Sequence, residues 1–359
     1  MQRVIAIDFG RGASVFVMML VHTLLMYGRP DVQTSATFGM PIHFAGRGAA
    51  MFLVAMGFSF ALSEKTPTQA ARRGATLFAL GYVMNLLSFL VPYFGQFMPE
   101  SFVRSYGFVP PIQPAGLLYL LLTGDVLQLA GISAGLMALL RGLLVRPYFV
   151  LASSLAVALV SSGLRGYRPQ IAGLDYLCDL MWAADSNVFF PVFPWLSVIL
   201  YGVFLGRLYQ HAGCDVERLL RVMLRLGLAL AVVGYVLCQV DPATHYGDFF
   251  HGGFGSMLAS MGSASMLFCL AHWLTPFFVR SRLADVLYRA SERVTQLYVI
   301  QWVLLCWGMG LVGFQQHGEL AVLGLTGIVM VLALASDRLL QEATHSLRPR
   351  PSPAESSAA

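Results

Sequence analysis

The chain has 359 residues, of which 57% are hydrophobic and only 11% are charged, and its mean hydropathy is +0.69. Soluble globular domains carry about 25% charged residues, so the composition excludes a water-soluble enzyme and indicates a polytopic protein embedded in the lipid bilayer. The formal charge is +5, but the sequence contains no soluble module with a basic face, which argues against nucleic-acid binding. The five cysteines are widely spaced, with no Cys-x-x-Cys pair, and most lie in or beside apolar runs. This pattern indicates small buried side chains.

Ten apolar segments are long enough to span, or nearly span, a bilayer. We expect an all-α bundle of about ten transmembrane helices, the first of them retained rather than cleaved as a signal peptide. Residues 1–343 would form this transmembrane domain, and residues 344–359, rich in Pro, Ser and Ala, a disordered cytoplasmic tail. In chain order the predicted segments cover residues 9–27, 45–63, 75–95, 116–140, 147–163, 188–208, 222–240, 253–274, 293–314 and 320–340.

Basic residues are distributed unevenly between the two ends of these segments. When the loops are assigned alternately to two sides, 18 of the 23 Lys and Arg residues fall on one side. The positive-inside rule then places that side, and both termini, in the cytoplasm. A missed or additional helix would scramble the alternation, so the bias supports ten segments. The other side holds Arg29, Arg47, Arg104, Arg165 and Arg168.

Three ionisable side chains share one face of the first segment. Asp8 and Arg11 are three residues apart, and His22 follows Arg11 after about three helical turns, or roughly 16 Å. Ionisable groups at membrane depth are costly and seldom face lipid, so this stripe indicates a functional site. The plainer interpretation is an interfacial Asp8–Arg11 ion pair, with His22 bonded to a neighbouring helix.

Polar groups in the next segments could join His22. His43 and Arg47 lie at the outer end of the second segment, although Arg47 could instead snorkel to headgroups. In the fourth segment Asp125 and Gln128 interrupt a Leu-rich run and are three residues apart, which would place them on one helix face. A buried carboxylate needs a partner, and the available cations are His22, Arg47 and Arg11.

Two later segments carry further candidates. Trp195, near the start of the sixth segment, is either an interfacial anchor or one wall of an acceptor pocket. Gln296, Tyr298 and Gln301 in the ninth segment either line a cavity or join helices by hydrogen bonds. No conventional metal-ligand spacing occurs, so no metal is predicted.

The order of these motifs resembles that of the membrane-embedded acyltransferases. Asp8-x-x-Arg11-Gly12, with a histidine eleven residues after the arginine, is similar to the first helix of heparan-α-glucosaminide N-acetyltransferase-like proteins and of bacterial polysaccharide O-acyltransferases. The resemblance to the first group spans roughly residues 3–210. It is carried by Gly124-Asp-Val-Leu-Gln128-Leu-Ala-Gly131, by Phe190-Pro-Val-Phe-Pro-Trp195 and by Gly202, Gly206 and Arg207.

The resemblance implies transfer of an acyl group, usually acetyl from acetyl-CoA, at a bacterial inner (plasma) membrane. The donor would bind on the cytoplasmic side, and the acceptor, a hydroxyl or amine of a carbohydrate or small molecule, on the far side. His22 would act as general base or carry the acyl group covalently, while Asp8 and Arg11 orient the inner end of the site.

The remaining candidates divide between acceptor and donor. His43, Arg47, Asp125, Gln128 and Trp195 would contact the acceptor or the oxyanion. The CoA moiety would be bound by Arg72, Arg73, Arg207, Gln296 and Tyr298.

Several alternatives stay open. In the animal lysosomal relatives Asn stands at the position of His22, and the important His lies further along, so His43 competes with His22 for the catalytic role. Gln301 stands where some relatives have His. Acyl length, acceptor and self-association as a homo-oligomer are undetermined. A transporter or flippase for a small or lipid-linked solute is the alternative function, although the sequence shows neither the internal repeats nor the paired broken helices expected of one.

Overall fold

The computed structural model describes residues 4–171, 173–185 and 187–346, which form helices joined by loops. Among these residues the strand-like pairings are two isolated β-bridges, Gly28 with His317 and Gly124 with Val188. The helices are α1 (Ile5–Tyr27), α2 (Pro30–Gln33), α3 (Gly39–Gly46), α4 (Ala49–Leu62), α5 (Pro67–Asn85), the π-helix η1 (Leu86–Leu90), α6 (Val91–Phe94), α7 (Glu100–Ser105), α8 (Pro114–Leu122), α9 (Val126–Leu139), α10 (Pro147–Leu164), α11 (Leu174–Trp182), α12 (Val192–His211), α13 (Val216–Val240), α14 (Pro242–His245), α15 (Phe254–Phe278), α16 (Arg282–Glu292), α17 (Val294–Val312) and α18 (Glu319–Ser346).

Nine spans within the described residues are long and apolar enough to cross a membrane, which confirms the all-α polytopic fold. One of them combines α3 with α4, and another combines α5, η1 and α6. The remaining predicted segment, residues 116–140, is not a single helix, because it divides into α8 and α9 at residues 123–125. Of the predicted tail, residues 344–346 belong to α18, and the others lie outside the described residues.

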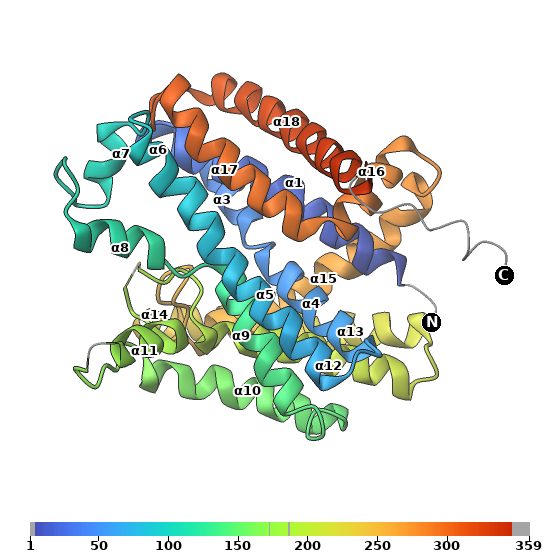
Figure 1. The fold of residues 1–359 in the computed structure, drawn as a ribbon. Helices are drawn as coiled ribbons and strands as arrows, with labels where there is room; N and C mark the ends of the chain where they lie inside the picture. Colours follow the sequence, from blue (N-terminus) through green and yellow to red (C-terminus); the bar gives the residue numbers. More distant parts are fainter. Residues whose placement is uncertain (1–3, 172, 186, 347–359) are drawn as a thin grey trace, which may run out of the picture.

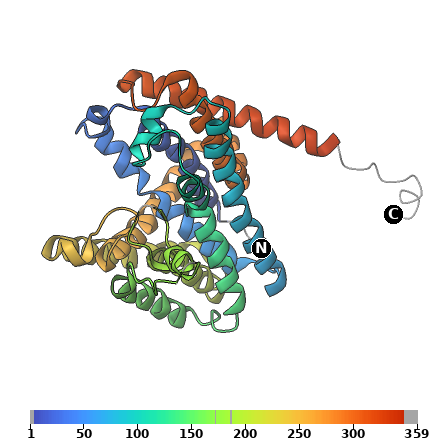
Figure 2. The same cartoon turned by 60° about the vertical axis from the view of Figure 1, so that its left-hand side comes forward.

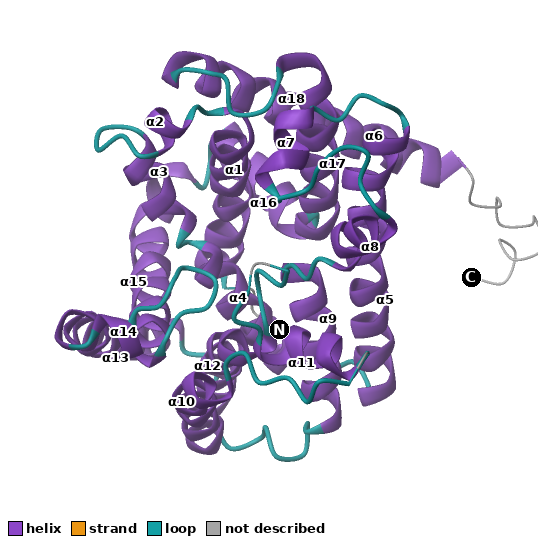
Figure 3. Ribbon diagram, turned by 90° about the vertical axis from the view of Figure 1, so that its left-hand side faces the viewer, coloured by secondary structure: helices purple, strands orange, loops and turns teal. Residues whose placement is uncertain are grey.

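The centre of the bundle is α12, whose apolar window is 83% buried. It packs against α4, α9, α10 and α15. Small residues permit the closest of these contacts: a Cβ on Gly57 of α4 would overlap the backbone of Ile199, and one on Gly202 would overlap that of Val54. The α13–α15 pair lies at one edge of the bundle (Figure 3).

The two ends of the bundle differ in character. The start of α1, helix α16 and the end of α18 lie together on the right of Figure 1, close to the Arg-rich loops. We call this the basic end. The small helices α7, α11 and α14 lie on the left, at what we call the loop end. The last turns of α18 project beyond the other helices (Figure 2).

Candidate active site

A polar cluster at the basic end joins α1 to α16. Arg11 donates from Nε to Ser291 Oγ at 3.0 Å and lies 3.9 Å from the Asp8 carboxylate. The hydroxyl of Ser291 is in turn 3.4 Å from Asp8. The two helices approach closely because residue 12 is glycine, where a Cβ would overlap the backbone of Leu287. The side chains of the predicted Asp8–Arg11 stripe are therefore paired at this end, with Ser291 as a third member.

A cavity of about 190 Å³ opens beside Arg11, between α1, α4, α5, α9 and α17. Its polar lining includes the basic Arg11, Lys65 and Arg73, the acidic Glu292, and the hydroxyls of Ser59 and Ser291. Apolar side chains of α4, α5 and α9 form the other walls. Guanidinium groups and hydroxyls beside apolar walls suit a ligand that has phosphates at one end and an apolar arm.

His22 lies further along α1, against α17. Its Nδ1 is 3.3 Å from Nε2 of Gln301. The imidazole packs on the Trp302 ring, with centroids 4.5 Å apart, and meets the Tyr298 ring edge-on at 6.1 Å. Arg11 contacts Ser291 while His22 contacts Gln301, so α1 and α17 run in the same direction. The polar stripe of α1 therefore faces α17 and the residues just before it.

Tyr298 links this histidine region to Asp125. The Tyr298 hydroxyl donates a hydrogen bond to the Asp125 carboxylate, and both residues are buried. The predicted position of Asp125 inside a helix is wrong, because Asp125 is the N-cap of α9. Its carboxylate accepts from Val126 N at 2.7 Å, and Gln128 Oε1 accepts from Asp125 N at 3.0 Å. Asp125 and Gln128 are thus joined by a capping box rather than by a shared helix face.

The backbone carbonyls freed by the helix break are satisfied from two other helices. Asn85, the last residue of α5 before η1, donates from Nδ2 to the carbonyls of Leu121 and Thr123 at 2.9 and 2.7 Å. The hydroxyl of Tyr176 on α11 donates to Leu122 O at 3.0 Å. Irregular backbone is tolerated at membrane depth only where protein groups bond it in this way.

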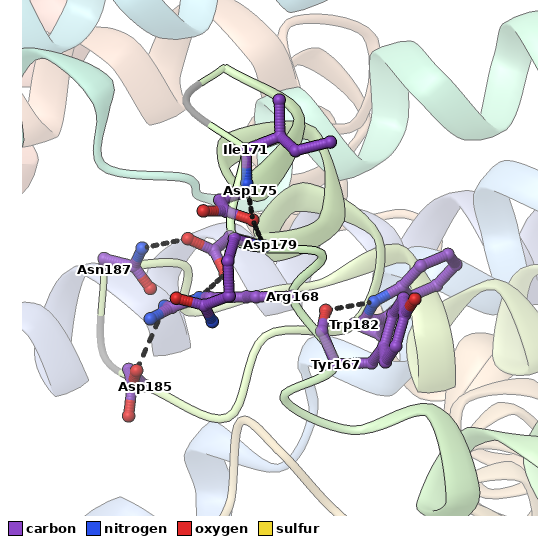
Figure 4. A network of polar contacts seen from close by, with 9 residues as sticks. Tyr167, Arg168, Ile171, Asp175, Asp179, Trp182, Asp185 and Asn187 are labelled. Carbon is purple, nitrogen blue, oxygen red and sulfur yellow. Dashed lines mark hydrogen bonds and ion pairs between the residues drawn. The ribbon is translucent and has the colours of Figure 1, made fainter.

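A loop-end segment bonds both backbone groups of Gly124. Its N–H donates to Asn187 O and its carbonyl accepts from Phe189 N, each at 2.8 Å. Figure 4 shows how this segment is fixed: Asn187 donates its amide to Asp179 at 2.8 Å, and Arg168 pairs with Asp179 at 2.6 Å. The hydrogen bond to Asp179 raises the pKa of Arg168. Hydrogen-bonded residues at the loop end therefore stabilise the break between α8 and α9.

Three residues predicted to contact the acceptor have other neighbours. Arg47 is exposed and donates to the Tyr246 hydroxyl at 2.9 Å, and His43 is half-buried on α3. Trp195 is 1% exposed and donates its indole N–H to Phe250 O at 2.7 Å. Trp195 therefore belongs to the protein core, which corrects the interpretation of it as an interfacial anchor.

The residues predicted to bind the donor are divided by the fold. Arg73 lines the cavity, whereas Arg72 and Gln296 do not; all three side chains are exposed. Arg207 donates to the backbone carbonyls of Leu144 and Ala61 at 2.8 and 3.1 Å, so it joins the end of α4 to the turn that follows α9. Tyr298 faces Asp125, as described above.

Some residues that complete the site were not singled out from the sequence: Ser59, Lys65, Asn85 and Ser291. Asn85 carried a usable signal, since it is an amide inside an apolar run. The serines carried none, because a hydroxyl in a membrane helix commonly bonds its own backbone or a neighbouring helix.

The fold and the site together define a polytopic α-helical membrane protein with ionisable groups buried at depth, as a membrane enzyme or a transporter requires. The sequence model of the family described as heparan-alpha-glucosaminide N-acetyltransferase, catalytic, matches residues 3–240. The chain belongs to this family and is, in the broad sense, a membrane acetyltransferase. The match ends with α13, so Ser291, Tyr298 and Gln301 come from beyond it. A comparison with curated proteins found no match.

Proposed function

We propose that the protein transfers an acetyl group from acetyl-CoA, bound at the basic end, to a hydroxyl or amine of a sugar-type acceptor that arrives from the loop end. The observation that carries this proposal is the cavity beside Arg11, with the Asp125–Tyr298 pair and then His22 lying further along the same helices. The cavity lining includes Leu127 and Thr295, each within one helical turn of the Asp125–Tyr298 pair.

The donor would place its phosphates near Arg11, Lys65 and Arg73, because guanidinium forks bind phosphate oxygens in two-point contacts. Its pantetheine arm would lie along the apolar walls and carry the thioester toward His22. Arg11 and His22 are separated by roughly 16 Å of helix, a length that an extended arm of this kind can cover.

His22 would take the proton of the acceptor hydroxyl or amine as the acceptor attacks the thioester carbonyl. The new C–O or C–N bond forms, the C–S bond breaks, and the proton passes from His22 to the departing thiolate. Asp125, held in place by the hydrogen bond from the Tyr298 hydroxyl, would orient the acceptor. In a two-step variant His22 itself carries the acetyl group.

The family description names an α-glucosaminide amine, so a glucosamine-terminated glycoside is the first acceptor to test. We place the basic end in the cytoplasm of a bacterial inner membrane, with both termini inside, because a cytosolic thioester needs access to the cavity and because basic loops favour that side. Residues 1–343 act as one transmembrane unit in this proposal.

The first experiment compares His22→Ala with the purified wild-type protein in acetyl-CoA turnover on that glycoside. We expect a loss of about 10²-fold or more in kcat, the usual contribution of a general base. His272→Ala is the matched control, since that histidine lies on α15 beside Glu217. Turnover of His22→Ala at the wild-type level would remove His22 from the mechanism.

A transporter would also use a broken helix such as α8–α9. Thermal stabilisation of the protein by acetyl-CoA, and not by the glycoside alone or by unrelated solutes, supports the transferase. Saturable uptake of the glycoside into proteoliposomes without acetyl-CoA would support the transporter.

A further inference from the structure

The amide of Gln301 is buried and only half bonded. The residue is 0% exposed, and its Oε1 has no hydrogen-bond partner among the described residues. Its Nε2 contacts Nδ1 of His22 at 3.3 Å. An unpartnered buried acceptor costs about 1–3 kcal/mol, so stability alone does not account for an amide at this position.

The imidazole of His22 is confined on three sides. Trp302 packs on its ring, Tyr298 meets it edge-on, and Gln301 contacts Nδ1. Nε2 is therefore the nitrogen left to face a reactant. Whether this nitrogen carries a proton or a lone pair depends on what Nδ1 does.

The two ends of an amide are nearly equal in size, so rotation by 180° exchanges Oε1 and Nε2 at the ring. When the amide nitrogen of Gln301 faces Nδ1 of His22, the neutral imidazole carries its proton on its own Nε2. That ring nitrogen then cannot act as a base. With Oε1 at Nδ1, the ring proton moves to Nδ1 and Nε2 presents a lone pair. The second arrangement also gives Oε1 the partner that it lacks.

We propose that Gln301 is a positioning residue whose carbonyl oxygen accepts Nδ1–H of His22 and so leaves Nε2 free to take the acceptor proton. This inference rests on the proposed role of His22. It gives Gln301 a further task, because the same oxygen stabilises Nδ1–H when the ring becomes an imidazolium during turnover.

Few other groups face this ring. Tyr298 and, through it, Asp125 approach from α17 and α9, and His43 lies on the adjacent α3. On α18, Glu319 and Asp337 are each hydrogen-bonded elsewhere. The α4 sequence contains no titratable side chain, and His272 of α15 lies at the basic end. A carboxylate placed at position 301 would therefore be the nearest charge to Nδ1 of His22.

The kinetic test uses full-length Gln301→Met and Gln301→Glu with acetyl-CoA and the glucosamine-terminated glycoside. Gln301→Met removes the hydrogen-bond acceptor of Nδ1–H and should lower kcat about tenfold or more, with KM for acetyl-CoA nearly unchanged. A carboxylate can only accept, so Gln301→Glu should recover much of the rate and move the acidic limb of the pH–rate profile upward by about one unit. Gln239→Met and Gln239→Glu, at an exposed position of α13, are the matched controls.

A spectroscopic measurement tests the same point without turnover. In histidine-¹⁵N-labelled protein, the signals that disappear in His22→Gln belong to His22, and their shifts report which nitrogen carries the proton. We expect the Nδ1–H form in the wild-type protein. An Nε2–H form there, or a Gln301→Met enzyme with wild-type kcat and pH profile, would overturn the proposal for Gln301. Full turnover by His22→Ala would instead contradict the proposed role of His22 itself. The two experiments therefore distinguish an error about Gln301 from an error about His22.

Discussion

The buried carboxylate of Asp125 has two structural roles. The carboxylate caps α9 by accepting from Val126 N at 2.7 Å, and it also accepts from the Tyr298 hydroxyl. A cap residue contributes about 0.5–2 kcal/mol to stability, and a buried carboxylate left without a donor is costly. Substitutions that keep the cap should therefore be separable from those that remove it.

Asp125→Ala should destabilise the protein by about 2–3 kcal/mol, because both the cap and the acceptor of Tyr298 are lost. Asp125→Asn should cost less than half as much, since its amide oxygen can still cap α9. Thermal unfolding of the two purified variants in one detergent measures the difference. Equal losses of stability would show that capping by Asp125 is not what holds this end of α9.

At the proposed donor site, substitutions of two adjacent arginines should differ in effect. Arg73 lines the cavity and Arg72 does not. Arg73→Ala should raise KM for acetyl-CoA about tenfold, as expected for loss of a charged hydrogen bond to phosphate, with kcat little changed. Arg72→Ala should have a much smaller effect. Equal effects of the two would place the CoA phosphates outside this cavity.

At the scale of elements, the broken α8–α9 helix depends on groups that other segments supply. Asn85 bonds two carbonyls, whereas Tyr176 bonds one from a partly exposed position. Asn85→Leu should cost about 2–4 kcal/mol, since it leaves two buried carbonyls without donors. Tyr176→Phe should cost about 1 kcal/mol. Thermal unfolding followed by size-exclusion chromatography gives the comparison, and a tolerated Asn85→Leu would contradict this account of the break.

The loop end should also show a pH dependence of its own. Burial alone would raise the pKa of Asp248, but hydrogen bonds from the backbone N–H and ring of His251 outweigh it and hold that pKa below its usual value. A depressed pKa stabilises the fold above the unfolded value near 4 and ceases to do so as the pH falls through the folded value. As the pH falls below about 4, the melting temperature of Asp248→Asn should therefore decrease less than that of the wild-type protein. Parallel decline of the two would contradict a role for Asp248.

The sequence predicted the spans more readily than the site, for physical reasons. Long apolar runs suffice to define nine spans, and the spacing of Arg11 and His22 suffices to place them on one face. The break at Gly124-Asp125 is not apparent from the sequence because its hydrogen-bond partners, the donor Asn85 and the acceptor Asn187, are distant along the chain. A local signal existed nonetheless: an Asp followed three residues later by Gln is a capping pattern.

For the molecule as a whole, the orientation in the membrane can be tested with natural cysteines. Cys178 lies on α11 at the loop end and Cys214 follows α12 at the basic end; both are partly exposed, whereas Cys238, Cys269 and Cys306 are buried. With both termini inside, a membrane-impermeant maleimide should label Cys178 in spheroplasts and Cys214 only after permeabilisation. Cys178→Ser and Cys214→Ser assign the signals. The opposite pattern would invert the proposed topology and place the cavity beside Arg11 outside the cell.

The hydrogen bonds at Gly124 also act as a mechanical linkage. The segment around residues 187–189 holds both backbone groups of this residue, and the next residue in the chain is Asp125. We therefore expect displacement of that segment to disturb the position of the Asp125 carboxylate, which is bonded to Tyr298. Under the proposed function, an acceptor that moves this segment would also move Asp125, so binding at the loop end and the geometry of the buried site would be coupled.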